Sequence, residues 1–198
     1  MANVELTMKN LEKRGFRVSR FPDRAAAAEY LLQEIGDLAV GIGGSVTVGE
    51  LDIYDRLAAR GEVFWQAKAE GDVSGLANAA PVYLLSANGV SESGLIINID
   101  GRSNRVVNAV FGTEKLYMII GINKIAPTDE MALWRARNIA APKNAKRLAK
   151  KTPCAIEGDK CYDCDSPDRI CRSFVHHERK PGGVAHFEVV IVDEALGY

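Results

Sequence analysis

Two short apolar runs constrain the fold of this chain most strongly. Residues 82–85 (VYLL) and 116–120 (LYMII) are rich in β-forming side chains and are not interrupted by polar ones. Strands of this kind lie inside parallel sheets, because helices cover both faces of such a sheet. Short strand patterns alternate with helical patterns along the rest of the chain, which is typical of an α/β domain. We therefore expect an α/β fold with a mainly parallel sheet flanked by helices.

The remaining elements follow from apolar periodicity and from capping residues. Polar residues that can cap a helix stand at Asn3 and Thr128, Pro22 and Asp23 start the second helical pattern, and Gly15 follows the first one. The patterns predict helices over 3–14, 22–35, 46–60, 104–111 and 128–150, and further strands over 16–21, 38–42, 62–66, 95–99 and 186–193.

Length and charge limit the classes of protein to consider. The 198 residues suffice for one well-buried domain, so we expect a single α/β domain over 1–198 that includes a cysteine-rich C-terminal segment at 152–180. A net charge of −1 gives no overall attraction to nucleic acid or to a membrane surface. No apolar run approaches the roughly 18 residues of a membrane span, and the N-terminus lacks a signal-peptide pattern, so a cytoplasmic location is expected. Apolar residues on the first two helices leave room for a homo-oligomer.

A glycine-rich turn joins one predicted strand to the next helix. It comprises Gly41, Gly43, Gly44 and Ser45, with Thr47 just beyond. Glycine lets the backbone approach a ligand closely, and N–H groups at a helix start carry partial positive charge. The turn is therefore a candidate binding site for a phosphate or carboxylate, with the two hydroxyls as further donors. The alternative is a simple strand–helix connection, since neither a G-x-G-x-x-G nor a Walker pattern is present.

A polar segment follows the strand at 82–85, where ligands bind in open α/β sheets. We expect Glu92 and Asp100 to be candidate catalytic acid–base groups. The candidate ligand-binding residues there are Asn88, Asn98, Asn104 and Arg105. The alternative is structural: the two carboxylates would hold backbone turns and pair with Arg102 or Arg105.

Four cysteines form a C-x6-C-x2-C-x6-C pattern at Cys154, Cys161, Cys164 and Cys171. Four thiolates suit tetrahedral zinc or an iron–sulfur cluster, and the spacing does not separate the two. The loop around them has few apolar residues, so a metal would supply order. Free or redox-paired cysteines are the alternative. His176 and His177 could replace one ligand, but a surface pair is the commoner explanation.

A basic cluster lies at the end of the predicted helix 128–150. It includes Lys143, Lys146, Arg147, Lys150 and Lys151. Basic residues near a helix C-terminus are usually solvated and interact well with the helix dipole, so we expect no nucleic-acid contact here.

Several motifs together resemble the LUD-domain family, the lactate-utilisation proteins. They are SANGVSESG at 86–94, INIDGRSNRV at 97–106, IIGINKI at 119–125, the glycine turn, and AAPKNAKRL at 140–148 with the cysteines after it. The resemblance covers roughly residues 3 to 192. It implies the fold group of coenzyme A transferases and sugar-phosphate isomerases (NagB/RpiA/CoA-transferase-like), whose ligands sit over the glycine turn and the carboxyl ends of the strands.

One sequence difference from that group excludes the covalent mechanism of the coenzyme A transferases. The transferases resemble S-E-N-G at the strand end, where the glutamate is the nucleophile, whereas this chain has Ser86, Ala87, Asn88 and Gly89. Ala87 has no carboxylate and cannot form an acyl intermediate.

The resemblance favours a small-molecule-binding domain that acts with iron–sulfur oxidoreductase subunits in oxidising lactate to pyruvate. Composition and spacing do not themselves indicate lactate. One alternative is a stand-alone enzyme on a small phosphorylated or carboxylated metabolite. The other is a non-catalytic regulatory or scaffold protein with a metal-stapled tail.

Overall fold

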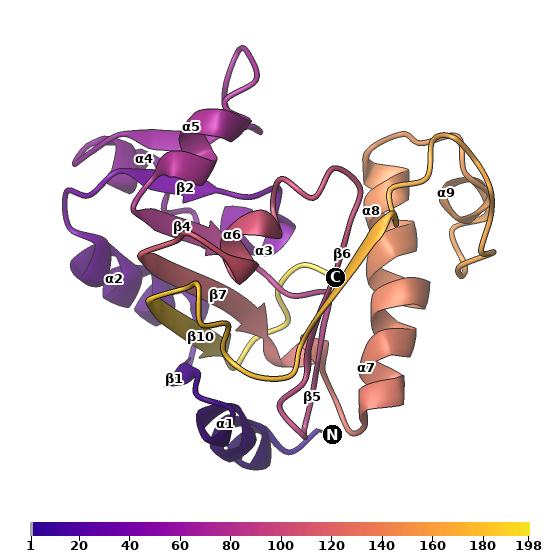
Figure 1. The fold of residues 1–198 in the computed structure, drawn as a ribbon, viewed down its shortest axis with the longest axis horizontal. Helices are drawn as coiled ribbons and strands as arrows, with labels where there is room; N and C mark the ends of the chain where they lie inside the picture. The colour runs from indigo at the N-terminus through magenta and orange to yellow at the C-terminus, as the bar shows by residue number, and fades with distance from the viewer. Residues whose placement is uncertain (1) are drawn as a thin grey trace.

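The computed structural model describes residues 2–198 and contains a six-stranded parallel sheet (Figure 1). Its strands lie in the order β1-β10-β7-β4-β2-β3, and every neighbouring pair is parallel. The strand bounds are β1 Arg17–Phe21, β2 Val40–Ile42, β3 Val63–Trp65, β4 Val82–Leu85, β7 Lys115–Gly121 and β10 His186–Val192. This confirms the predicted α/β fold with a mainly parallel sheet.

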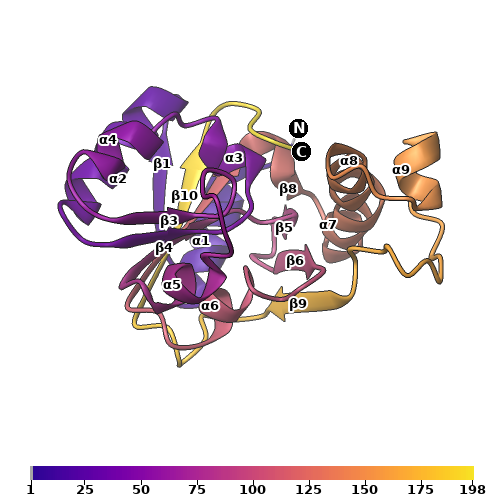
Figure 2. The ribbon, with the colours of Figure 1, turned by 90° about the horizontal axis from the view of Figure 1, so that it is seen from above.

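Helices cover both faces of this sheet because successive strand residues point to opposite sides. On one face α2 (Arg24–Ile35), α3 (Val46–Gly49) and α4 (Tyr54–Ala58) pack with Val82 and Leu84. On the other, α1 (Val4–Lys13), α5 (Ser74–Ala79) and α6 (Val107–Val110) pack with Tyr83 and Leu85. Figure 2 shows the two layers from above. The buried runs are therefore central strands with both faces covered, as their composition predicted.

Two helix starts have the predicted caps. The Asn3 side chain accepts a hydrogen bond from Leu6 N–H, and the Thr128 side chain accepts one from Met131 N–H. Asp23, expected inside the second helix, instead caps it by accepting from Ala26 N–H. The helix predicted over 46–60 is instead two short helices, α3 and α4. Asp52 lies between them with a φ of 52°, a left-handed conformation that ends regular helix.

A second sheet was not predicted. It consists of β8 (Ile125–Ala126), β5 (Gly89–Ser91), β6 (Ile96–Asp100) and β9 (Ser173–His177), in that order. The predicted strand at 95–99 thus belongs to this sheet, where it is antiparallel to both neighbours. In β9 the His177 side chain is buried, so the interpretation of His176 and His177 as a surface pair is wrong for His177.

A long helical segment packs against the second sheet. It runs through α7 (Asp129–Arg135), the π-helical turn η2 (Ala136–Ala140) and α8 (Ala141–Arg147). The cysteine-bearing region follows: α9 (Pro153–Glu157) packs on α8, and residues 158–172 are irregular (Figure 1). Among residues 2–198, no helix has the length and apolar character needed to cross a membrane.

Candidate functional site

A cleft of about 590 Å³ lies between the carboxyl ends of the parallel strands and helix α8. Ligand sites in open α/β sheets occupy this position. The lining comes from the turn at 44–47, Gln66, the segment 86–88, the end of β6 and the loop after it (99–105), Lys124, α8 with residues 148 and 150, the loop 167–172, and Tyr198. The volume is in the range of pockets that enclose small metabolites.

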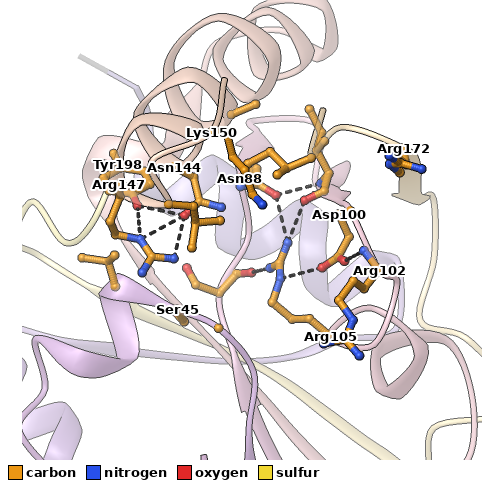
Figure 3. A pocket seen from close by; sticks show the side chains of 18 of the residues that line it. Ser45, Asn88, Asp100, Arg102, Arg105, Asn144, Arg147, Lys150, Arg172 and Tyr198 are labelled. Atoms are coloured by element: carbon orange, nitrogen blue, oxygen red, sulfur yellow. Dashed lines mark hydrogen bonds and ion pairs between the residues drawn. The ribbon is translucent and has the colours of Figure 1, made fainter. Parts of the chain in front are cut away.

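Arg105 lies at the centre of the sheet-side wall (Figure 3). A guanidinium has five N–H donors, and Arg105 forms five hydrogen bonds, to Asp100 Oδ2 (3.0 Å), Ser86 O (3.0 Å), Asn98 Oδ1 (3.2 Å), Asn88 Oδ1 (3.3 Å) and Ile99 O (2.9 Å). It therefore ties the segment after β4 to strand β6 of the second sheet. These internal contacts use its whole donor capacity.

Asp100 is similarly engaged. Its Oδ2 accepts from Arg105, and its Oδ1 accepts from the backbone N–H groups of Arg102 (3.0 Å) and Ser103 (2.7 Å). Only 9% of its side chain is exposed, against 11% for Arg105. This geometry corresponds to the structural alternative, in which the carboxylate holds a turn and pairs with an arginine.

The structure places the other sequence-predicted residues in two groups. Those that line the cleft with Asp100 and Arg105 are Gly44, Ser45, Thr47, Asn88 and Asn104. Four others lie outside the lining: Gly41, Gly43, Glu92 and Asn98. Glu92 contacts the start of α1, where its Oε1 accepts from Asn3 N–H at 2.7 Å. Asn98 is fully buried beneath Arg105.

The glycine turn serves packing at two of its positions. A Cβ on Gly41 would lie 2.0 Å from the Ala77 carbonyl oxygen, and one on Gly43 would lie 2.6 Å from Arg105 Cγ. Gly44 has open space beside it and lines the cleft. The turn thus allows close approach of α5 and of the Arg105 stem, and only its last part borders the cleft.

Lys124 was not singled out from the sequence, although it lies in the IIGINKI motif. It ends the short 3-10 turn η1 (Ile122–Lys124) directly after β7, and only 3% of the residue is exposed. Its Nζ donates to Thr47 Oγ1 (2.7 Å), Ser86 Oγ (2.9 Å) and Ala87 O (3.2 Å). Burial lowers the pKa of Lys124 to about 7, and the positive charges of Arg135 and Arg105 act in the same direction, against Glu50. A lysine immediately after a buried strand was the available sequence signal.

Cations dominate the charge of the cleft. Seven line it, against two acidic side chains, Asp100 and Asp168, although the chain as a whole has a net charge of −1. The seven are Arg102, Arg105, Lys124, Arg147, Lys150, Arg169 and Arg172. The wall supplied by α8 and by 167–172 therefore contributes four of them.

Three of these cations lack a carboxylate partner on the wall facing the sheet. Within the described chain, the ion pairs of cleft arginines join Arg102 to Asp72, Arg105 to Asp100 and Arg169 to Asp163. Apart from the enclosed Lys124, the cations left over are Arg147, Lys150 and Arg172, labelled in Figure 3 and called the rim cations below. Sequence analysis assigned the first two to a solvated helix end, since nothing in the sequence indicates that α8 faces the sheet across a cleft.

Neutral groups hold two of the rim cations. Arg147 donates to Asn144 Oδ1 and, at 2.9 Å, to the Tyr198 hydroxyl. Arg172 donates to the backbone carbonyls of Arg169 and Pro167. Hydrogen bonds to neutral groups fix a guanidinium without cancelling its charge, so these side chains are positioned and still positive.

The four cysteines are half-buried free thiols. Cys154 lies in α9 next to the Thr152 hydroxyl (3.3 Å), and the other three lie in the irregular segment. Between residues 2 and 198, no three His, Cys, Asp or Glu side chains are grouped closely enough to hold a metal ion. The donors as arranged here do not fit zinc or an iron–sulfur cluster, and the metal site stays a prediction.

Comparison with known proteins adds a family and a fold. A family model described as the LUD domain matches residues 4–192. No curated protein matches this chain. Among solved structures, the chain is similar to a DUF162 family protein from Deinococcus radiodurans, with 12% sequence identity and a TM-score of 0.50 over 96% of this chain and 95% of that one. At this identity the similarity concerns the fold alone.

Proposed function

This chain belongs to the LUD-domain family, and we propose that its cleft binds a small, multiply charged anionic metabolite, either phosphorylated or carboxylated. One observation carries the proposal: Arg147, Lys150 and Arg172 line the cleft without a carboxylate partner in the described chain. Unpaired cations that share a cavity repel each other and attract an anion. A bound anion would neutralise them.

The size of the cleft favours a ligand larger than a simple hydroxy acid. Its volume is about 590 Å³, and a lactate ion alone would occupy a small part of it. Cations come from both α8 and the loop at 167–172, so a ligand with two charged groups could contact both. Arginine suits this task because its planar donors match carboxylate and phosphate oxygens.

Calorimetric titration of the full chain tests the proposal. The probes are pyrophosphate, citrate, inorganic phosphate and lactate at low and moderate salt. We expect pyrophosphate or citrate to bind more tightly than phosphate or lactate, and the affinity to fall as salt screens the charges. Equal or absent binding of all four probes would contradict the proposal.

Matched arginine variants locate the binding. Arg147→Gln removes a rim cation and keeps a hydrogen-bonding side chain. Arg56→Gln removes an exposed arginine that pairs with Glu29 on α2 and lies outside the cleft lining. Anion affinity should fall in the first variant and stay unchanged in the second.

A second candidate function is a role beside iron–sulfur subunits in oxidising lactate to pyruvate. Family membership and the C-x6-C-x2-C-x6-C pattern favour it. It predicts iron and labile sulfide, with a visible colour, in protein purified without oxygen. Stoichiometric zinc without colour would instead favour a structural tail, and metal-free protein would contradict the four-thiolate site.

A further inference from the structure

Lys124 differs from every other cation of the cleft in being enclosed. The residue is 3% exposed, yet it lines the cleft together with Thr47, Ser86 and Ala87, the three residues that its Nζ contacts. Within the described residues no carboxylate forms an ion pair with it, and the nearby Glu50 carboxylate accepts instead from Gly197 N–H at 2.7 Å. A buried ammonium without a counter-ion is costly, so such a site favours the neutral amine.

The partners of Nζ suit a group that gains and loses a proton. Two of the three are hydroxyls, and a hydroxyl can either accept from an ammonium or turn and donate to an amine. Carboxylate or carbonyl partners, which only accept hydrogen bonds, would stabilise the charged form of a lysine that merely connects chain segments. The surroundings of Lys124 therefore accommodate both protonation states.

We propose that Lys124 is the covalent attachment point for the carbonyl group of an aldehyde or ketone that bears an anionic group. This inference rests on the proposed function, because the rim cations would hold the anionic group of the same molecule. The Nζ lone pair attacks the carbonyl carbon to form a carbinolamine, whose hydroxyl then leaves. A carbon–nitrogen double bond replaces the carbon–oxygen double bond, and both protons of the amine leave with the oxygen as water.

The two hydroxyls are placed to carry the protons of this reaction. Thr47 Oγ1 and Ser86 Oγ lie 2.7 and 2.9 Å from Nζ. In the first step they can take a proton from nitrogen, and in the second they can give one to the departing oxygen. No oxidant or reductant is required, since imine formation changes no oxidation state.

The test is reductive trapping on the full chain. Protein is incubated with pyruvate or with dihydroxyacetone phosphate and then with borohydride, which reduces an imine to a stable secondary amine. Peptide mapping by mass spectrometry identifies the modified lysine. The two probes distinguish a carboxylate-bearing from a phosphate-bearing substrate, and dihydroxyacetone is the probe without an anionic group.

We expect an adduct on Lys124 with at least one anionic probe, formed well before any adduct on exposed lysines. Excess pyrophosphate should suppress it, and dihydroxyacetone should give much less. The rate should rise with pH and reach half its maximum near the pKa of about 7, because burial, and after it the charges of Arg135 and Arg105, disfavour the charged form more than Glu50 favours it. An exposed lysine would react only at far higher pH.

Two variants control the assignment. Lys124→Arg keeps a cation at this position and cannot form an imine, so it should give no adduct there. Lys115→Arg changes a lysine at the opposite end of β7, outside the cleft lining, and should leave the adduct intact. If Lys124→Arg folds poorly, the peptide map of the wild-type protein still shows whether Lys124 carries the adduct.

Adducts confined to exposed lysines, with Lys124 unmodified by both anionic probes, would overturn the inference. If pyrophosphate still bound in that case, the anion proposal would stand and only the covalent step would fail. The third outcome is an adduct on Lys124 together with no binding of pyrophosphate and no suppression of the adduct by it. That result would support Lys124 as the attachment point and contradict the anion proposal.

Discussion

The two walls of the cleft use arginine in opposite ways. On the sheet side, Arg105 directs all five donors to protein acceptors and pairs with a nearly buried Asp100. On the α8 side, Arg147 is held by neutral groups and has no carboxylate partner in the described chain. An arginine beside a cavity is therefore part of the scaffold when its donors are used internally, and is available to a ligand when its charge is not compensated.

This distinction separates stability from binding. Removing a cation from the sheet-side wall should leave Asp100 buried and unpaired, which costs folding free energy. Removing one from the α8 wall should relieve repulsion between like charges and affect the ligand instead.

The largest effect is expected for Arg105→Ala. Breaking a buried ion pair by removing one partner typically costs about 3–5 kcal/mol in the free energy of unfolding, because the remaining charge loses its partner. Lys150→Ala, on the other wall, should change it by about 0.5 kcal/mol or less. Denaturant unfolding of both variants measures the difference, and similar losses in the two would remove the distinction between the walls.

The next effect concerns anion affinity. Arg147→Gln should weaken binding of a multiply charged anion by about tenfold to a hundredfold, since a hydrogen bond to a charged group contributes about 1.5–3 kcal/mol. Its free energy of unfolding should stay close to that of the wild type. A variant that lost stability and kept its affinity would assign Arg147 to the scaffold.

Lys124 contacts the cleft and is also buried, and its expected effect is a dependence of the free energy of unfolding on pH. Its folded-state pKa of about 7 is below the unfolded value of roughly 10.4, so the unfolded chain binds more protons between those values and stability rises with pH there. The contribution is at most about 1.4 kcal/mol per pH unit. The free energy of unfolding can be measured for wild type and Lys124→Met at about pH 7, 8 and 9, in the lower part of that window. It should rise less steeply with pH in the variant. Equal slopes would mean that Lys124 is charged throughout.

The smallest effect is expected at Arg102, which lines the cleft but pairs with the exposed Asp72 at 3.1 Å. Asp72→Asn should free its charge and raise anion affinity by less than Arg147→Gln lowers it, because exposed ion pairs are weak. Calorimetry with pyrophosphate checks this. A fall in affinity would show that the Arg102–Asp72 pair positions the ligand rather than competing with it.

Sequence reasoning predicted the parallel sheet because buried strands at 82–85 and 116–120 have a composition that few other environments tolerate. It missed the second sheet because β5 and β8 have only three and two residues, and because the pairings of β5 with β8 and of β6 with β9 join segments distant in the chain. Such pairing leaves no local pattern. The interruption of the helix at 46–60 likewise depends on the backbone of Asp52, which no periodicity reveals.

The candidate site was predicted in position and only partly in composition. Polar residues after β4 and β6 do line the cleft, among them Asn88 and Asp100. Of the rim cations, Arg147 and Lys150 were expected to lie on a solvated helix end and Arg172 was not singled out, because their role depends on where α8 packs. Neither the satisfied donors of Arg105 nor the enclosure of Lys124 could be read from residue type, since both depend on contacts between segments far apart in the sequence.

A crystal structure of the full chain with pyrophosphate would show which wall of the cleft binds the anion. We predict that the anion lies in the cleft against Arg147, Lys150 or Arg172, while the five hydrogen bonds of Arg105 stay intact. An anion bound outside the cleft, or one that takes the donors of Arg105 and breaks its pair with Asp100, would contradict the division between a scaffold wall and a ligand-binding wall.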